Sequence, residues 1–389
     1  MRASPKQGAP LTLKRVVVLV ISFAVGVVLA AGIAESTATV GPVGPIIFLA
    51  YLVGAIFVHE LGHLIGAAMV GFQVKSFAVG PLMLCRERDG FRLRRSHFKL
   101  GGMVTAVPVG SHDLRRRMLV MTAAGPISSV LFALLAFVPA HVLSGRWSDL
   151  IVIFSVFSAG LALLSLLPTR KFYLSDGAQI FDMLRFPDRG DRQCALLALA
   201  EAANNGSRPR DWDPLLIGKA LAFSDGSGRD VLGNIMAYEQ AMDRREFDVA
   251  ERHLESTLNL RQKCPAKLKS GIALDAAFFN AMVRAENVAA REWFQECNAS
   301  DIRDRYFLLM VEASVLLVEG NFDQALRRAE ESVSTLPQAQ FPGFAAAAQE
   351  WLELISKQAR KKVSLTPDHT LAELTMAVKE NASEASIRC

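Results

Sequence analysis

The chain has 389 residues, of which 51% are hydrophobic and 21% are charged, and its formal net charge is +5. This length allows two or three domains, and the small positive charge argues against a nucleic-acid-binding protein, because much of it lies beside apolar runs where basic residues set membrane topology. Five cysteines without a Cys-x-x-Cys pair favour reduced structural thiols over a disulfide framework.

Long uncharged runs occupy the chain up to about residue 167, and no later run is long enough to cross a bilayer. We predict an all-α membrane protein, in which a four-span transmembrane helix bundle with a short β-hairpin insertion precedes a soluble α-helical repeat domain. The spans are expected at about 16–35, 45–70, 118–143 and 150–167, and a short loop holding Arg146 and Asp149 separates the last two.

The insertion 71–116 is polar, rich in arginine and interrupted by glycines, which predicts short strands instead of a helix. The basic N-terminus 1–15, this insertion and Arg170-Lys171 after the fourth span are all expected on the cytosolic side, following the positive-inside rule. Both termini are then cytosolic, and we expect a multi-pass protein of a bacterial cytoplasmic membrane.

The second predicted span contains the sequence His59-Glu60-Leu61-Gly62-His63. Two histidines four residues apart share one face of a helix and can bind one metal ion, and the glutamate beside the first is a natural base for catalysis. Ionisable side chains in a membrane span are costly and therefore candidates for function. The structural alternative is a pair of buried histidines bonded to carbonyl groups, with Glu60 paired to one of them.

Catalytic zinc usually has three protein ligands, so a third is expected elsewhere in the chain. Asp176 is favoured because it follows the fourth span on the cytosolic side, where the chain can fold back beside the histidines, and Gly177 allows a close backbone approach. Asp182 is the rival ligand. Three histidines outside the motif are poorly placed for this role: His97, His112 and His141.

The C-terminal half is soluble and rich in predicted helix, with a linker at 186–230, a tetratricopeptide-like domain at 231–360 and a tail at 361–389. Ala250, Ala290 and Ala325 occupy matching places in successive turn–helix segments, as small packing residues do in helical repeats. An unrelated helical hairpin domain is the alternative. A repeat array of this kind typically binds a protein partner, so we expect a cytosolic regulator or substrate there.

Taken in order, these motifs resemble the site-2 protease family of intramembrane zinc metalloproteases. The matching elements are His59-Glu60-Leu61-Gly62-His63, the hairpin Lys99-Leu100-Gly101-Gly102-Met103-Val104, the helix segment Ala124-Gly125-Pro126-Ile127-Ser128-Ser129, and Ser165-Leu166-Leu167-Pro168 followed by Asp176-Gly177. The resemblance covers about residues 45–185. It departs from the family at Ser129 and Ser165, where asparagines are usual, and in a longer spacer before Asp176.

The resemblance implies one zinc ion per chain, held by His59, His63 and Asp176, with Glu60 as the catalytic base. It implies a membrane-bound substrate with a single transmembrane segment, and the exposed edge of residues 99–107 is a candidate for binding its unwound chain by strand addition. The resemblance also assigns substrate binding or support of the site to further residues: Gly101, Gly102, Gly125, Pro126, Ser129, Ser165 and Pro168.

Two other functions compete with proteolysis. The first is a catalytically weak or inactive membrane scaffold that keeps the metal site and binds partners through its repeats, which the serines at 129 and 165 favour. The second is a soluble metalloenzyme tethered to the membrane, which the position of the motif inside a span disfavours.

Overall fold

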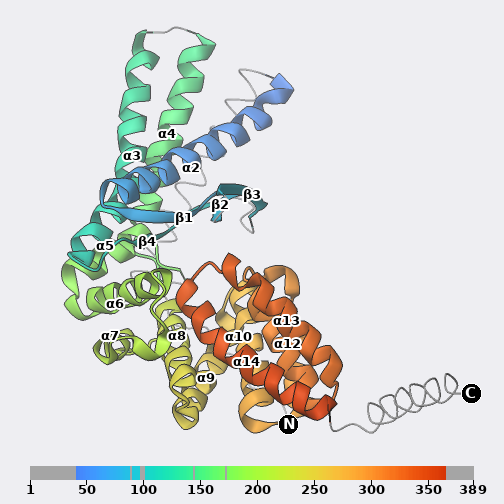
Figure 1. The fold of residues 1–389 in the computed structure, drawn as a ribbon. Helices are drawn as coiled ribbons and strands as arrows, with labels where there is room; N and C mark the ends of the chain where they lie inside the picture. The colour runs from blue at the N-terminus through green and yellow to red at the C-terminus, as the bar shows by residue number, and fades with distance from the viewer. Residues whose placement is uncertain (1–40, 88–89, 97–100, 143–144, 171–172, 365–389) are drawn as a thin grey trace, which may run out of the picture. The chain divides into compact units, whose positions relative to one another are not determined.

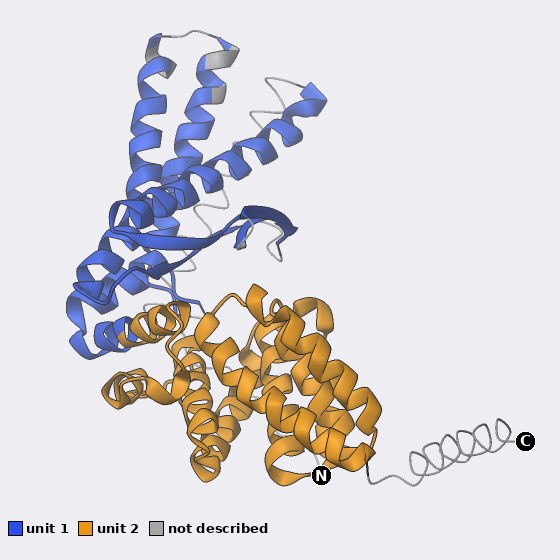
Figure 2. Cartoon of the chain, in the orientation of Figure 1, with its two compact units in different colours: residues 1–194 blue, residues 195–389 orange. Residues whose placement is uncertain are grey.

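The structure is a computed structural model that describes residues 41–87, 90–96, 101–142, 145–170 and 173–364. The chain divides into two compact units, residues 1–194 and residues 195–389 (Figure 2). Over the described residues the chain is mostly helical, as predicted, and it contains one small antiparallel sheet. The predicted first span and the C-terminal tail from residue 365 lie outside the described residues.

Unit 1 is built on helix α2 (Gly44–Met69), which a 3₁₀ turn, η1 (Gly41–Val43), precedes. Pro45 stands in the first turn of α2, where its missing N–H costs nothing. The helix ends where Gly71 adopts a left-handed φ of +70°. The apolar stretch from Gly41 to Met69 is long and apolar enough to cross a membrane, and this agrees with the predicted second span.

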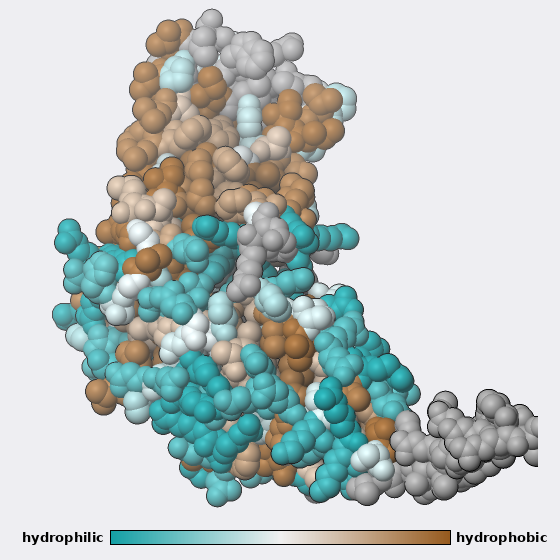
Figure 3. Space-filling model, viewed as in Figure 1, coloured by the Kyte–Doolittle hydropathy of each residue, from teal (hydrophilic) through white to brown (hydrophobic). Residues whose placement is uncertain are grey.

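Helices α3 (Leu114–Val142) and α4 (Arg146–Leu166) run side by side, and α2 crosses both (Figure 1). Among the described residues, α3 is the second helix that passes the length and hydropathy test for a span, over Leu114–Pro139. The apolar part of α4, Ile151–Leu166, is shorter. Figure 3 shows the hydrophobic surface that these helices present on the visible face of unit 1.

The predicted loop before the fourth span is wrong at its C-terminal side. Arg146 and Asp149 belong to the first turn of α4, not to a loop. Gly145, with φ +71°, ends the connection, and an acidic side chain near a helix N-terminus interacts favourably with the helix dipole. The connection between α3 and α4 is therefore shorter than the sequence suggested.

Small residues let α2 and α3 approach closely. A methyl group on Gly62 would lie 2.2 Å from Oγ of Ser128, and one on Gly66 would lie 2.6 Å from Cβ of Ala124. Glycines four residues apart on one helix face allow such close backbone packing between membrane helices. The α3 backbone therefore lies directly against the face of α2 that carries the two histidines.

The insertion forms a four-stranded antiparallel sheet, which is larger than the predicted hairpin. Its strands are β1 (Phe72–Val79), β2 (Leu82–Glu87), β3 (Gly90–Arg95) and β4 (Gly102–Pro108), in the order β3-β2-β1-β4. Gly80, with φ +54°, and Pro81 form the turn between β1 and β2. In this order β4 is an edge strand that pairs with β1 and packs beside α2.

Arg117 fixes the end of α2 to the turn between β4 and α3. Its side chain is buried, and its guanidinium donates hydrogen bonds of 2.8–3.2 Å to five backbone carbonyls. These carbonyls belong to Val70, Gly71, Val109, Gly110 and His112. Because each carbonyl receives a charge-assisted hydrogen bond, the metal-motif helix is held in a fixed position relative to the sheet.

Two further helices follow α4: α5 (Asp176–Arg185) and α6 (Pro187–Asn204). Unit 2 continues with η2 (Pro209–Asp211), α7 (Pro214–Ala220), α8 (Gly228–Arg244), α9 (Phe247–Leu260), η3 (Arg261–Lys263) and α10 (Ala266–Phe279). After a π-helical turn, η4 (Asn280–Arg284), come α11 (Asn287–Gln295), η5 (Ala299–Asp301), α12 (Arg305–Val318), α13 (Phe322–Thr335), η6 (Leu336–Gln338) and α14 (Pro342–Val363).

Three helical hairpins of unit 2 share one register. Ala250, Ala290 and Ala325 are each fully buried at the fourth residue of α9, α11 and α13. Five residues before each alanine, the turn residue has a left-handed φ: 63° at Arg245, 55° at Ala285 and 84° at Gly320. Only the third of these positions carries the glycine that such a conformation favours.

We therefore expect Ala285→Gly to stabilise unit 2 by up to about 1 kcal/mol, because glycine removes the steric cost of the left-handed conformation. Urea unfolding followed by tryptophan fluorescence tests this, since Trp212, Trp293 and Trp351 all lie in unit 2. The control Ala289→Gly, inside α11, should destabilise the unit by roughly 0.5 to 1 kcal/mol. Equal effects of the two substitutions would contradict the strain argument.

Candidate metal centre

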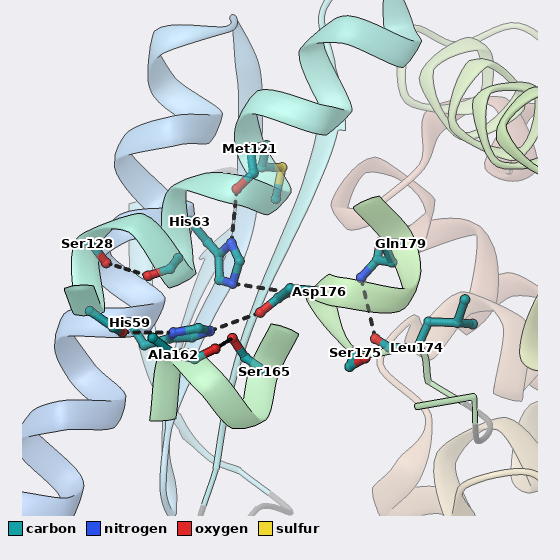
Figure 4. A network of polar contacts seen from close by, with 12 residues as sticks. His59, His63, Met121, Ser128, Ala162, Ser165, Leu174, Ser175, Asp176 and Gln179 are labelled. Carbon is teal, nitrogen blue, oxygen red and sulfur yellow. Dashed lines mark hydrogen bonds and ion pairs between the residues drawn. The ribbon is translucent and has the colours of Figure 1, made fainter. Parts of the chain in front are cut away.

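The two motif histidines and Asp176 meet in unit 1 (Figure 4). His59 and His63 are 6% and 8% exposed on α2, and their ring centroids are 4.9 Å apart. From the N-terminus of α5, Asp176 places Oδ2 3.1 Å from Nε2 of His59 and Oδ1 3.4 Å from Nε2 of His63. One nitrogen or oxygen atom from each residue lies within 4.8 Å of the others, which is close enough for all three to bind one ion.

The second nitrogen of each ring has its own partner. Nδ1 of His59 lies 3.0 Å from Oγ of Ser129, and Nδ1 of His63 lies 2.9 Å from the carbonyl of Met121. Histidines that bind a metal usually donate the other ring N–H in this way, which fixes the tautomer and the ring orientation. Both Nε2 atoms are thereby left to face Asp176.

This donor set fits zinc. Two imidazole nitrogens and one carboxylate are a common ligand set of catalytic zinc and leave a position for water or substrate. Burial raises the pKa of Asp176, but hydrogen bonds with His59 and His63 outweigh that effect and lower its pKa to about 2. Asp176 is therefore ionised at neutral pH, as a metal ligand must be.

Local hydrogen bonds position Asp176. Ser175 caps α5: its Oγ accepts hydrogen bonds from the N–H groups of Ala178, at 3.3 Å, and Thr169, at 3.0 Å. The same hydroxyl donates to the carbonyl of Leu167 at 2.5 Å. Gly177 is required next to it, because a methyl group there would lie 1.8 Å from the carbonyl oxygen of Leu166. The end of α4 and the start of α5 are thus held together around Asp176.

Asp182, the rival ligand, is buried and paired with two arginines. It is 1% exposed and forms ion pairs with Arg170 and Arg189, one turn and a half along α5 from Asp176. In the described part of the chain it is not among the residues grouped with the two histidines. His97 lies outside the described residues, and so does the side chain of His141.

Backbone atoms of β4 and α3 lie in close contact with the side chains of Glu60 and His63. Glu60 is 7% exposed, and a methyl group on Gly102 of β4 would lie 2.3 Å from its Cγ. A methyl group on Gly125 of α3 would lie 2.3 Å from Nε2 of His63. Both positions therefore exclude any larger residue, and β4 and α3 lie directly beside Glu60 and His63.

The remaining predicted support residues differ in their distance from the ligands. Oγ of Ser129 contacts His59, whereas Oγ of Ser165 donates to the carbonyl of Ala162 in its own helix at 3.0 Å. The carbonyl of Gly101 accepts a hydrogen bond from Gly80 in the sheet. Pro126 lies within α3 and Pro168 in the loop after α4. The assignments of Gly101, Pro126, Ser165 and Pro168 stay predictions.

Three supporting groups escaped the sequence analysis. The first is the backbone carbonyl of Met121, which no side chain in the sequence indicates. The second is Ser175, which caps α5, although the sequence shows only that a serine precedes Asp176. Ser128 donates to the carbonyls of Val58 and Gly125 and so fixes α3 beside the start of the motif (Figure 4).

Ser129→Ala should weaken zinc binding by about 10- to 100-fold, because His59 loses the hydrogen bond that orients its ring. The matched control is Ser165→Ala, whose hydroxyl bonds only within α4 in the described contacts. Zinc affinity can be measured in detergent by competition with a chromophoric chelator. Equal affinities of the two variants would show that Ser129 does not support the ligand.

Comparisons with known proteins agree with this site. A family model described as Peptidase family M50 matches residues 47–384. A predicted zinc metalloprotease of Chlamydia pneumoniae is 30% identical over an aligned stretch that covers 23% of this chain and 18% of the relative. The chain therefore spans less than a fifth of that relative's length. No solved structure matches the chain.

Proposed function

The chain belongs to peptidase family M50, whose members are membrane-bound zinc metalloproteases of the site-2 type, and from this premise we propose that it hydrolyses a peptide bond in or near the transmembrane segment of a membrane protein. The observation that carries the proposal is the cluster of His59, His63 and Asp176 beside Glu60, with both histidines on an apolar helix of membrane-spanning length.

In this proposal His59, His63 and Asp176 hold one zinc ion per chain. When bound, the ion supplies a Lewis acid to the reaction. Glu60 is the neighbour of His59 and is not among the grouped ligands, so its carboxylate is free to take a proton from the attacking water and pass it to the leaving amine. Burial beside Gly102 keeps that carboxylate in one position.

The proposed topology has four spans with both termini in the cytosol of a bacterial cytoplasmic membrane. Basic residues beside the predicted spans support it through the positive-inside rule. In this orientation the zinc ligands lie in the cytosolic half of the bilayer, which gives water a short path to the site.

The proposed substrate is a membrane protein with a single transmembrane segment, which must unwind before its carbonyls can be attacked. Residues 99–107 are the proposed binding edge for the unwound chain. The position of β4 at the edge of the sheet, with Gly102 against Glu60, supports this assignment. An edge strand offers unpaired backbone groups to a chain of this kind.

Proline substitutions at residues 103–105 test the binding edge. At a position whose N–H faces away from β1, proline should lower kcat/KM by about two- to tenfold, because the substrate loses one backbone hydrogen bond. Bound zinc should stay at the wild-type level. Unchanged cleavage of every substrate by all three variants would rule out this edge.

Unit 2 is the proposed docking domain for a cytosolic regulator or substrate, in a tetratricopeptide-like arrangement, and we propose no nucleic-acid partner. The shared register of its three helical hairpins supports the repeat assignment. Helix α14 restricts where a partner binds: Trp351 packs against Phe278 at 5.1 Å, and Arg245 lies 3.3 Å above the Trp351 ring. A partner must therefore use surfaces that α14 leaves open.

A catalytically weak scaffold is the second candidate. The observation in its favour is that the hydroxyl of Ser165 donates its hydrogen bond to a carbonyl of its own helix. In the site-2 protease family, which this part of the chain resembles, an asparagine at this position supports the site. Ser129, the other departure from the family, does contact a ligand.

One experiment separates the two candidates. The purified protein is reconstituted in lipid, its bound zinc is measured, and it is incubated with a library of single-span peptides before and after zinc removal by a chelator. Cleavage that disappears with the metal and returns with added zinc supports the protease. Bound zinc without cleavage, across varied lipids and substrates, supports the scaffold instead.

A further inference from the structure

Helix α5 exposes an apolar surface on the side opposite its packed face. Ala178, Asp182 and Met183 are buried, while Phe181 and Leu184 are 47% and 67% exposed. Phe186, directly after the helix, is 39% exposed and stacks edge to face on Phe181 with 5.5 Å between the ring centroids. Large apolar side chains gathered in this way indicate a surface that another body covers.

Two arginines border these residues. Arg185 is exposed in the last turn of α5, and the guanidinium carbon of Arg189 lies 4.9 Å from the centre of the Phe186 ring. Arg189 also pairs with the buried Asp182, Nη1 to Oδ1, at 3.6 Å. We call these five residues, Phe181, Leu184, Arg185, Phe186 and Arg189, the α5 patch. Apolar side chains beside guanidinium groups match the boundary between acyl chains and phosphate headgroups.

The α5 patch follows a surface that already faces lipid in the proposed topology. In the last turns of α4, Leu163 and Leu166 are 53% and 43% exposed. Helix α5 begins ten residues after Leu166 and packs against both α3 and α4. The patch therefore lies at the end of the apolar helices, where a membrane protein meets the bilayer surface.

We propose that the α5 patch binds the surface of the phospholipid bilayer. Phe181, Leu184 and Phe186 insert among the upper parts of the acyl chains, and the two arginines bind headgroup phosphates. Asp176 is the first residue of the same helix, so this contact ties the third zinc ligand to the membrane surface. The proposal concerns lipid contact alone and does not depend on whether the chain cleaves peptides.

Tryptophan fluorescence tests the proposal in the full-length protein. Leu184→Trp is reconstituted in nanodiscs of phosphatidylcholine with and without bromine atoms on the upper acyl-chain carbons, which quench tryptophan on contact. The spectrum of the parent protein is subtracted to remove its four tryptophans. The added tryptophan should lose at least about half of its emission in the brominated discs and should emit at shorter wavelength than in water.

Val288→Trp is the control, because Val288 is 66% exposed on α11 of unit 2 and should show no quenching by bromine. Bound zinc equal to the parent level confirms that α5 remains folded. An unquenched, water-like spectrum of Leu184→Trp would overturn the proposal. An unquenched spectrum at short wavelength would overturn it as well, since a protein surface would then cover the patch.

Discussion

Replacing Glu60 with Gln should lower the cleavage rate by at least about a hundredfold while bound zinc remains at the wild-type level. Glutamine has nearly the same size and shape, so the close contact between residue 60 and Gly102 is kept. An amide cannot take a proton from water, and the loss of a positioned general base typically costs a factor of about 10² to 10⁴. The expected defect lies in kcat, not in metal binding.

Three measurements make this result decisive: zinc content, the thermal unfolding midpoint, and single-turnover cleavage of a peptide that the wild type cuts. Glu255→Gln, on the exposed face of α9, controls for the loss of one carboxylate at the surface. A Glu60→Gln protein that cleaves at the wild-type rate would remove Glu60 from the mechanism. Loss of zinc in this variant would make Glu60 a support of the metal site instead of the base.

Asp176→Ala should weaken zinc binding by more than about a hundredfold, because it removes one of the three proposed ligands. Loss of a residue that only supports a ligand typically costs about 10- to 100-fold in metal affinity. His59 and His63 would remain on α2 with their second ring nitrogens bonded as before. Zinc affinity can be measured in detergent by chelator competition, and the alanine variant should show no cleavage at zinc concentrations that saturate the wild type.

The matched control is Asp182→Asn, which lies on the same helix and changes a buried carboxylate paired with Arg170. It should lower the thermal stability of the protein, because a buried ion pair loses one charge, but leave zinc affinity near the wild-type value. The reverse pattern, with zinc retained in Asp176→Ala and lost in Asp182→Asn, would reassign the third ligand.

The ligand geometry was largely predictable from sequence. Helical spacing places His59 and His63 on one face. Because catalytic zinc usually has three protein ligands, a third was expected elsewhere, and Asp176 was favoured although it lies more than a hundred residues away in the sequence. Asp176 was already favoured over Asp182 from its position in the sequence, whereas the ion pair between Arg170 and Asp182 could not be predicted, because it depends on how the chain folds after α4. The carbonyl of Met121 was beyond prediction, since every residue has such a group and its use depends on how α2 and α3 pack.

The extent of the sheet and the turns of unit 2 were harder to predict for a different reason. A single hairpin was expected in the insertion, although Gly80-Pro81 is a turn signal and separates two strands that pair with each other, β1 and β2. The buried alanines of the helical hairpins followed from their spacing. The left-handed turns at Arg245 and Ala285 did not, because neither residue type favours that conformation.

The close approach of Gly102 and Gly125 to the reactive side chains has a consequence for inhibitor design. At Gly102 and Gly125 the main chain itself lies against Glu60 and His63, so a substitution at either position cannot widen the site and would instead displace one of these two side chains. Asp176, with 14% of its side chain exposed, is the most accessible of the three ligands. A slim metal-chelating group that approaches past Asp176 therefore fits this site better than a bulky one.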